Sequence, residues 1–163
     1  MLLRRIQNEC TTGRKWMRKP IFIVSLCVTL AAVLAAMFFS SQGSTASNAL
    51  SKELLYKIME LFQIEITMAS VKQGNFLIRK AAHFLLYFIL GMGLTTTLQF
   101  QRKLPAWLPA LVLGAVFAAT DEFHQSFTGR TAMVKDVVLD SCGVAVGCFV
   151  AWQLWKKWGK DCG

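Results

Sequence analysis

Long apolar runs alternate with short charged stretches along this chain. Four runs are candidate membrane-spanning helices: about 21–39, 81–100, 107–120 and 137–155. A helix needs about 20 residues to cross roughly 30 Å of hydrocarbon, and the first, second and fourth runs meet that need. The third is apolar for only about 14 residues, so it completes a crossing only if it carries Asp121 and Glu122 into the outer part of the bilayer.

The composition places the chain among membrane proteins. Of its 163 residues, 55% are hydrophobic and 17% are charged, with a mean hydropathy of +0.46. A soluble domain of this size is more polar, so the fold class is all-α: an integral membrane four-helix bundle with an additional extracytoplasmic amphipathic helix. The net charge of +9 comes from Lys and Arg that flank the spans. We therefore expect membrane lipids as partners and no nucleic acid.

The pattern divides the chain into five segments. They are a basic cytoplasmic arm at 1–20, the first transmembrane helix at 21–39, an extracytoplasmic linker and amphipathic helix at 40–79, a three-span region at 80–158, and a cytoplasmic tail at 159–163. Ser40 to Thr45 is typical of a flexible linker. The external helix is predicted from Leu50 to about Met68, with Leu54, Ile58, Leu61, Phe62 and Ile64 on its apolar face. The first span is interpreted as an uncleaved anchor, with a cleaved signal peptide as the alternative.

The distribution of Lys and Arg sets the expected orientation. Eleven of the eighteen lie in the amino-terminal arm, between the second and third spans, or after the fourth. Cytoplasmic loops carry the excess of Lys and Arg, so both termini are predicted to be cytoplasmic. Trp16, Trp107, Trp152, Trp155 and Trp158 then lie towards the same side. Five cysteines without a Cys-x-x-Cys pair predict no disulfide framework and no zinc site.

Ionisable residues gather at the opposite, exterior ends of the spans. On a helix at 100° per residue, Lys80, His83 and Tyr87 fall within a ~60° arc. A similar arc of the last span carries Asp136, Asp140, Gly143 and Gly147. Because glycines allow close helix contact, this face should pack against another helix and point both carboxylates into the bundle.

The third span ends in a second polar group. Asp121 and Gln125 share a helix face with Glu122 beside them, and Arg130 follows a glycine that permits a turn. Ionisable residues at membrane depth are costly and mark functional sites. The predicted ligand-binding residues are therefore Lys80, His83, Tyr87, Asp121, Glu122, Gln125, Arg130, Asp136 and Asp140. The alternative for each is a structural pair inside the bundle. His124 lies off the Asp121–Gln125 face and is expected at the surface.

These motifs resemble the VanZ-like family. Residues 79–87 (RKAAHFLLY) are similar to its first conserved block, and residues 121–130 (DEFHQSFTGR) with the acids and glycines of the last span are similar to its second. The resemblance covers about residues 78–150. Thr128 stands where the family usually has proline, and Asp140 where it often has asparagine. The resemblance implies a small bacterial envelope protein, in the cytoplasmic membrane, associated with low-level teicoplanin resistance.

Three functions remain open from the sequence. The first is binding or shielding, in which an outward-facing pocket binds an anionic lipid headgroup or a lipid-linked cell-wall precursor and lowers susceptibility to glycopeptides. The second is an intramembrane hydrolase or transferase, with Glu122, Asp121 and His83 as catalytic candidates and a metal-dependent version using His83 with nearby carboxylates. No nucleophile motif supports it, so we favour binding without a cofactor. The third is a small transporter or scaffold. The oligomeric state is left open.

Overall fold

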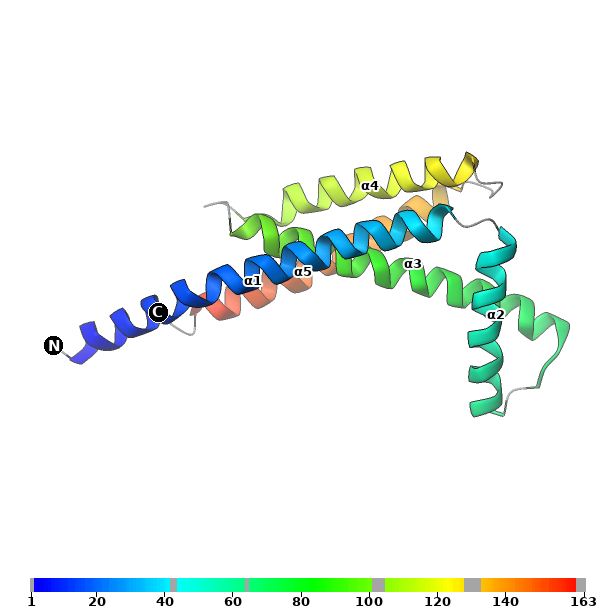
Figure 1. Ribbon diagram of the computed structural model, residues 1–163, viewed down its shortest axis with the longest axis horizontal. Helices are drawn as coiled ribbons and strands as arrows, with labels where there is room; N and C mark the ends of the chain where they lie inside the picture. The colour runs from blue at the N-terminus through cyan, green and yellow to red at the C-terminus, as the bar shows by residue number, and fades with distance from the viewer. Residues whose placement is uncertain (1, 42–43, 64, 101–104, 128–132, 161–163) are drawn as a thin grey trace.

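Within the residues that it describes, the computed structural model is entirely helical (Figure 1). It describes residues 2–41, 44–63, 65–100, 105–127 and 133–160, with side chains placed for 19–41, 51–63, 65–100, 105–127 and 133–157. The helices are α1 (Leu2–Ser41), α2 (Ser44–Leu61), α3 (Met68–Gln99), α4 (Trp107–Phe127) and α5 (Val134–Lys160). The predicted all-helical fold class is confirmed.

Four of the helices lie side by side along one long axis. In Figure 1, α1 and α4 run in one direction and α3 and α5 in the other, so α3 and α5 are parallel. Helix α3 contacts each of the other four helices, and its interface with α5 is the most extensive in the protein. Helix α2 lies across one end of the bundle and packs against α3 (Figure 1).

Among the described residues, three helices are long and apolar enough to cross a membrane. These candidate spans are Lys19–Ser41, Met68–Gln99 and Val134–Lys157. Large apolar side chains are exposed on the outer surface of the bundle, including Leu34 at 66% and Val116 at 59%. A soluble protein would bury such side chains, whereas lipid accepts them. The structure therefore supports the assignment of the chain to membrane proteins. That α4 also crosses the membrane remains a prediction.

The segment between the first two spans differs from the prediction. Helix α2 begins at Ser44 where a flexible linker was expected, and α3 begins at Met68, well before the predicted start near residue 81. Thr67 caps α3: its hydroxyl accepts a hydrogen bond from the Ser70 backbone N–H at 3.2 Å, and its own N–H donates to Ser70 Oγ at 2.9 Å. This capping box satisfies free N–H groups at the helix start, a signal that a search for apolar runs overlooks.

Helix α2 also packs through a different face from the one expected. Among its placed side chains (51–61), Leu55 and Met59 are buried, whereas Leu54 and Leu61 of the predicted apolar face are exposed. The side chain of Leu55 lies against Gly74 of α3. Packing against α3 therefore chooses the buried side of α2. The exposed side chains Leu54 and Leu61 are free to meet a membrane surface, which stays a prediction.

Glycines set the close approach of α3 and α5. A Cβ on Gly143 would lie 2.6 Å from the Phe84 carbonyl oxygen, and one on Gly147 would collide with the Phe88 carbonyl oxygen. On α3, a Cβ on Gly91 would collide with the Val144 carbonyl oxygen. Small residues let membrane helices approach to backbone contact. The predicted packing role of Gly143 and Gly147 agrees with this geometry.

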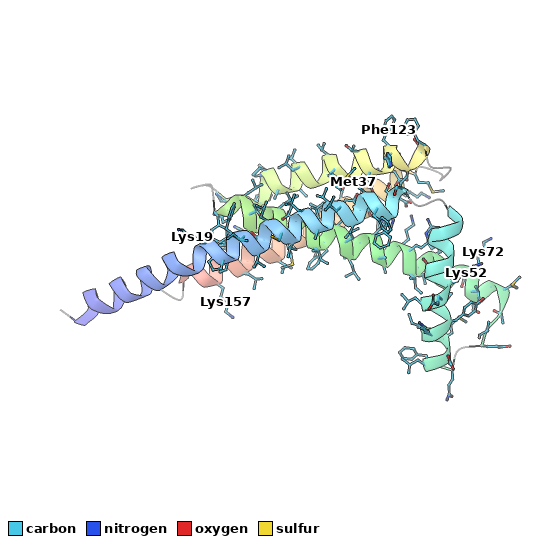
Figure 2. The ribbon with its side chains drawn as sticks, viewed as in Figure 1. Lys19, Met37, Lys52, Lys72, Phe123 and Lys157 are labelled. Atoms are coloured by element: carbon cyan, nitrogen blue, oxygen red, sulfur yellow. The ribbon has the colours of Figure 1, made fainter. Side chains whose placement is uncertain are left out.

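The two ends of the bundle carry different side chains. Lys19 and Lys157 lie at one end, and Met37 and Phe123 at the other (Figure 2). At the basic end, Lys156 Nζ lies 3.6 Å above the Trp152 ring, a cation–π contact. Cytoplasmic loops carry the excess of Lys and Arg, whereas tryptophan occurs at both membrane interfaces, so the cytoplasmic location of both termini remains a prediction.

Cysteine labelling checks that orientation. In a variant without native cysteines, we expect a membrane-impermeant maleimide to label Leu61→Cys in intact cells. Lys157→Cys should react only after permeabilisation, because positive ends remain cytoplasmic. Both side chains are exposed in the structure, so poor access does not explain a missing signal. The reverse labelling pattern would place the acidic end in the cytosol.

Candidate functional site

The predicted polar residues meet where α4 ends and α5 begins, against the middle of α3. Side chains from three helices form the cluster: Lys80, His83 and Tyr87 from α3, Asp121, Glu122 and Gln125 from α4, and Asp136 and Asp140 from α5. Most are deeply buried; Tyr87 is 0% exposed, Asp140 1% and Asp121 5%. Arg130 lies outside the described residues. His124 is exposed, as expected.

Asp121 is held by two neutral donors. The Tyr87 hydroxyl donates a hydrogen bond to Asp121 Oδ2 at 3.0 Å, and Gln125 Nε2 donates to the same oxygen at 3.1 Å. Ser40, at the end of α1, donates to the Asp121 backbone oxygen at 3.4 Å. Asp121 and Gln125 thus share one helix face, as predicted, and this face points into the bundle. These donors fix the orientation of the Asp121 carboxylate.

Two acid–base pairs join α3 to α5. Lys80 Nζ forms an ion pair with Asp136 Oδ1, and both side chains are about one quarter exposed. One turn deeper, His83 Nδ1 lies 3.6 Å from Asp140 Oδ2. The pairs repeat at helical spacing on both helices because α3 and α5 run parallel. The predicted pairing of acids with Lys80 and His83 therefore agrees with the geometry.

Glu122 joins α4 to the start of α5. Its Oε1 accepts a hydrogen bond from the Met133 backbone N–H at 2.8 Å. Met133 immediately precedes α5, so the carboxylate satisfies a backbone donor that the helix itself leaves free. A negative charge is also favourable at a helix N-terminus. Glu122 therefore has a structural contact in addition to any functional role.

Carboxylates outnumber cationic groups among the placed side chains of the cluster. Asp121, Glu122, Asp136 and Asp140 face Lys80 and, when it is protonated, His83. Ligand atoms of His83, Asp121 and Asp140 all lie within 4.8 Å of one another. This trio, found among the described residues, can hold a metal ion. Its charge suits a cation better than an anion.

A family model described as VanZ/LLP1 matches residues 22–156. The chain belongs to the VanZ/LLP1 family. The match starts within α1 and ends within α5, so the VanZ/LLP1 region includes the first span and α2. The motif resemblance, which covered only about residues 78–150, was too narrow. No curated protein and no solved structure matches the chain.

Two contacts of the site escaped sequence analysis. The contact at Met133 is made by its backbone N–H, so the residue type gives no sign of it. Ser40 was interpreted as the start of a linker. A polar residue that ends an apolar span marks a position where a contact to another helix is possible, which is the signal that Ser40 offered. A similar contact between α1 and α3 occurs nearer the Lys19 end of the bundle, where Thr97 Oγ1 donates to Ser25 Oγ at 3.0 Å.

Proposed function

We propose that this VanZ/LLP1 chain acts in the bacterial cytoplasmic membrane, with both termini cytoplasmic. At the buried cluster it binds the headgroup of an anionic lipid or of a lipid-linked cell-wall precursor. By altering how the precursor is displayed, it lowers susceptibility to glycopeptides such as teicoplanin. The observation that carries this proposal is the convergence of ionisable side chains from three helices at the end of the bundle away from the basic, tryptophan-rich end.

An adjoining groove supports a lipid ligand. Lys72, Gln73, Phe76 and Leu77 of α3 line an open groove of about 500 Å³. The Phe76 ring lies 5.4 Å from Lys80 Nζ, so the groove leads from an apolar surface to the Lys80–Asp136 pair. A lipid chain can lie along Phe76 and Leu77 while its headgroup reaches Lys80. That arrangement places apolar and charged parts of one ligand on matching surfaces.

The pairs of the cluster modify how an anionic headgroup is bound. Lys80 is engaged by Asp136, and His83 faces Asp140. An anion must therefore compete with a carboxylate for each cationic side chain. The Lys80–Asp136 pair is partly exposed, so Lys80 can exchange Asp136 for a phosphate at small cost. His83 and Asp140 are deeper and do not offer the same exchange.

A second candidate is an intramembrane hydrolase or transferase that acts on a lipid-linked phosphate. The grouping of His83, Asp121 and Asp140 favours it, because a histidine beside carboxylates supports proton transfer or metal-assisted chemistry. Glu122 and Asp121 are the other catalytic candidates. Release of phosphate from lipid diphosphates by the purified protein would identify this activity, whereas retention of the intact lipid in native mass spectrometry supports binding.

Drug-susceptibility profiling of a deletion strain tests the proposed function. We expect wild type and the surface variant His124→Ala to restore the minimum inhibitory concentration of teicoplanin. Glu122→Gln and His83→Ala should leave it at the level of the deletion, because both change the cluster. Immunoblots of membranes verify equal amounts of each variant. Full rescue by both cluster variants would separate the site from glycopeptide susceptibility.

A further inference from the structure

Asp140 is buried and accepts no hydrogen bond from the part of the chain that the structure describes. Its side chain is 1% exposed, and neither Oδ1 nor Oδ2 accepts a hydrogen bond from any described residue. His83 Nδ1 lies 3.6 Å from Asp140 Oδ2, beyond hydrogen-bond length. A buried charge without such partners costs several kcal/mol. Among the described residues no group satisfies the two Asp140 oxygens, and a bound cation would do so.

Two further potential metal ligands, a second carboxylate and an imidazole, lie close to Asp140. Asp121 reaches it from α4 and His83 from α3, and one ligand atom from each of the three residues lies within 4.8 Å of the others. Three helices thus present two carboxylates and one imidazole to a common centre. A His83–Asp140 ion pair on its own leaves the second carboxylate, Asp121, uncompensated, because Tyr87 and Gln125 are neutral donors.

We propose that His83, Asp121 and Asp140 bind one divalent transition-metal cation of the Mn²⁺ or Zn²⁺ type. An imidazole combined with carboxylates is a suitable donor set for these ions, while Ca²⁺ prefers oxygen ligands only. Ligand atoms about 2.1 Å from one ion lie at most about 4.2 Å apart. The three ligand atoms lie within 4.8 Å of one another, so small side-chain rotations, driven by attraction to the ion, are enough to bring them to bonding distance.

The surroundings of the trio are suited to support such an ion. Ligating carboxylates are usually oriented by hydrogen bonds from neighbouring groups, and Tyr87 and Gln125 supply two of these to Asp121 Oδ2. Gly143 brings α5 against the Phe84 carbonyl, which holds Asp140 level with His83. The nearby Lys80 is neutralised by Asp136 and so repels a cation less than a free lysine would.

A cation at this position also changes the charge of the site. With three protein ligands, the ion keeps coordination positions open for water or for a phosphate oxygen. The positive charge of the bound ion would allow the acidic cluster to bind an anionic headgroup. Cation binding by the protein alone does not depend on the proposed function, so failure of the susceptibility experiment leaves the cation site standing.

The test uses the purified full-length chain in detergent, first stripped with a chelator and then given Mn²⁺, Zn²⁺ or Ca²⁺. Calorimetry and metal analysis after desalting should give about one Mn²⁺ or Zn²⁺ per wild-type chain, with weaker Ca²⁺ binding. His83→Ala and Asp140→Asn should raise the Kd at least about tenfold, as changes to a metal's surroundings do. His124→Ala and Glu60→Gln remove an exposed imidazole and an exposed carboxylate, and both variants should bind metal like wild type.

A thermal measurement separates a metal site from a structural ion pair. We expect Mn²⁺ or Zn²⁺ to raise the apparent Tm of wild type and of both controls, and the chelator to reverse that rise. Asp140→Asn keeps the shape of the side chain, and its Tm should not respond to metal. The proposal is overturned if wild type binds no more metal than Asp140→Asn. It is also overturned if Asp140→Asn lowers the Tm equally with and without chelator.

Discussion

Gly91→Ala is expected to lower the apparent Tm of the purified protein by several degrees and to reduce its amount in the membrane. The new Cβ collides with the backbone carbonyl of Val144, whose Cα would lie 2.9 Å away. Backbone atoms of α5 cannot rotate aside as a side chain can, so α3 and α5 must separate. Overpacking of a close contact costs about 1–3 kcal/mol, and separation also weakens the largest interface of the bundle.

Gly74→Ala is the matched control on the same helix. Its Cβ would lie 2.6 Å from Leu55 Cδ1, the free end of a flexible side chain that can rotate away. Alanine is also favoured over glycine in a helix by up to about 1 kcal/mol, so this variant should unfold at or above the wild-type temperature. Tryptophan fluorescence during heating in detergent measures both. Equal Tm values for the two variants would show that α3 and α5 do not depend on this contact.

The sequence predicts the helices well where one apolar run makes one helix. The runs at 21–39 and 137–155 lie within α1 and α5, and the run at 81–100 ends one residue beyond α3, because burial in lipid demands length and apolarity that are visible residue by residue. The start of α3 and the extent of α2 were wrong. Both depend on the Thr67–Ser70 capping box and on packing of Leu55 against α3, and neither contact requires a long apolar run.

The face of each helix at the site also follows from the sequence, whereas most of the pairs between helices do not. A period of 3.6 residues puts Asp121 beside Gln125 and Asp136 in line with Asp140, and the structure shows both arrangements. Which acid meets which base depends on the parallel register of α3 and α5. That register is set by backbone contacts at glycines such as Gly143, and a single sequence does not contain it.

Asp121→Leu is expected to lower the apparent Tm more than any other single change in the cluster. The leucine fills a similar space but accepts no hydrogen bond, so the Tyr87 hydroxyl loses its acceptor and Gln125 Nε2 loses its bond to Oδ2. Both side chains are buried, and a buried donor left unsatisfied costs about 1–3 kcal/mol. Thermal unfolding in detergent and trypsin sensitivity in membranes measure the loss.

The double variant Tyr87→Phe/Asp121→Leu isolates the part of this loss that comes from the hydroxyl. Removing both partners of a buried hydrogen bond is nearly neutral compared with removing one, so the double variant should be more stable than Asp121→Leu alone. Tyr56, the other tyrosine of the chain, is exposed on α2. Tyr56→Phe is the control for the substitution itself, and its Tm should equal that of wild type. If Tyr87→Phe lowers the Tm by the same amount in wild type and in Asp121→Leu, the two residues are not coupled. The hydrogen bond between Tyr87 on α3 and Asp121 on α4 would then not contribute to stability. Gln125 would be the group that orients the Asp121 carboxylate.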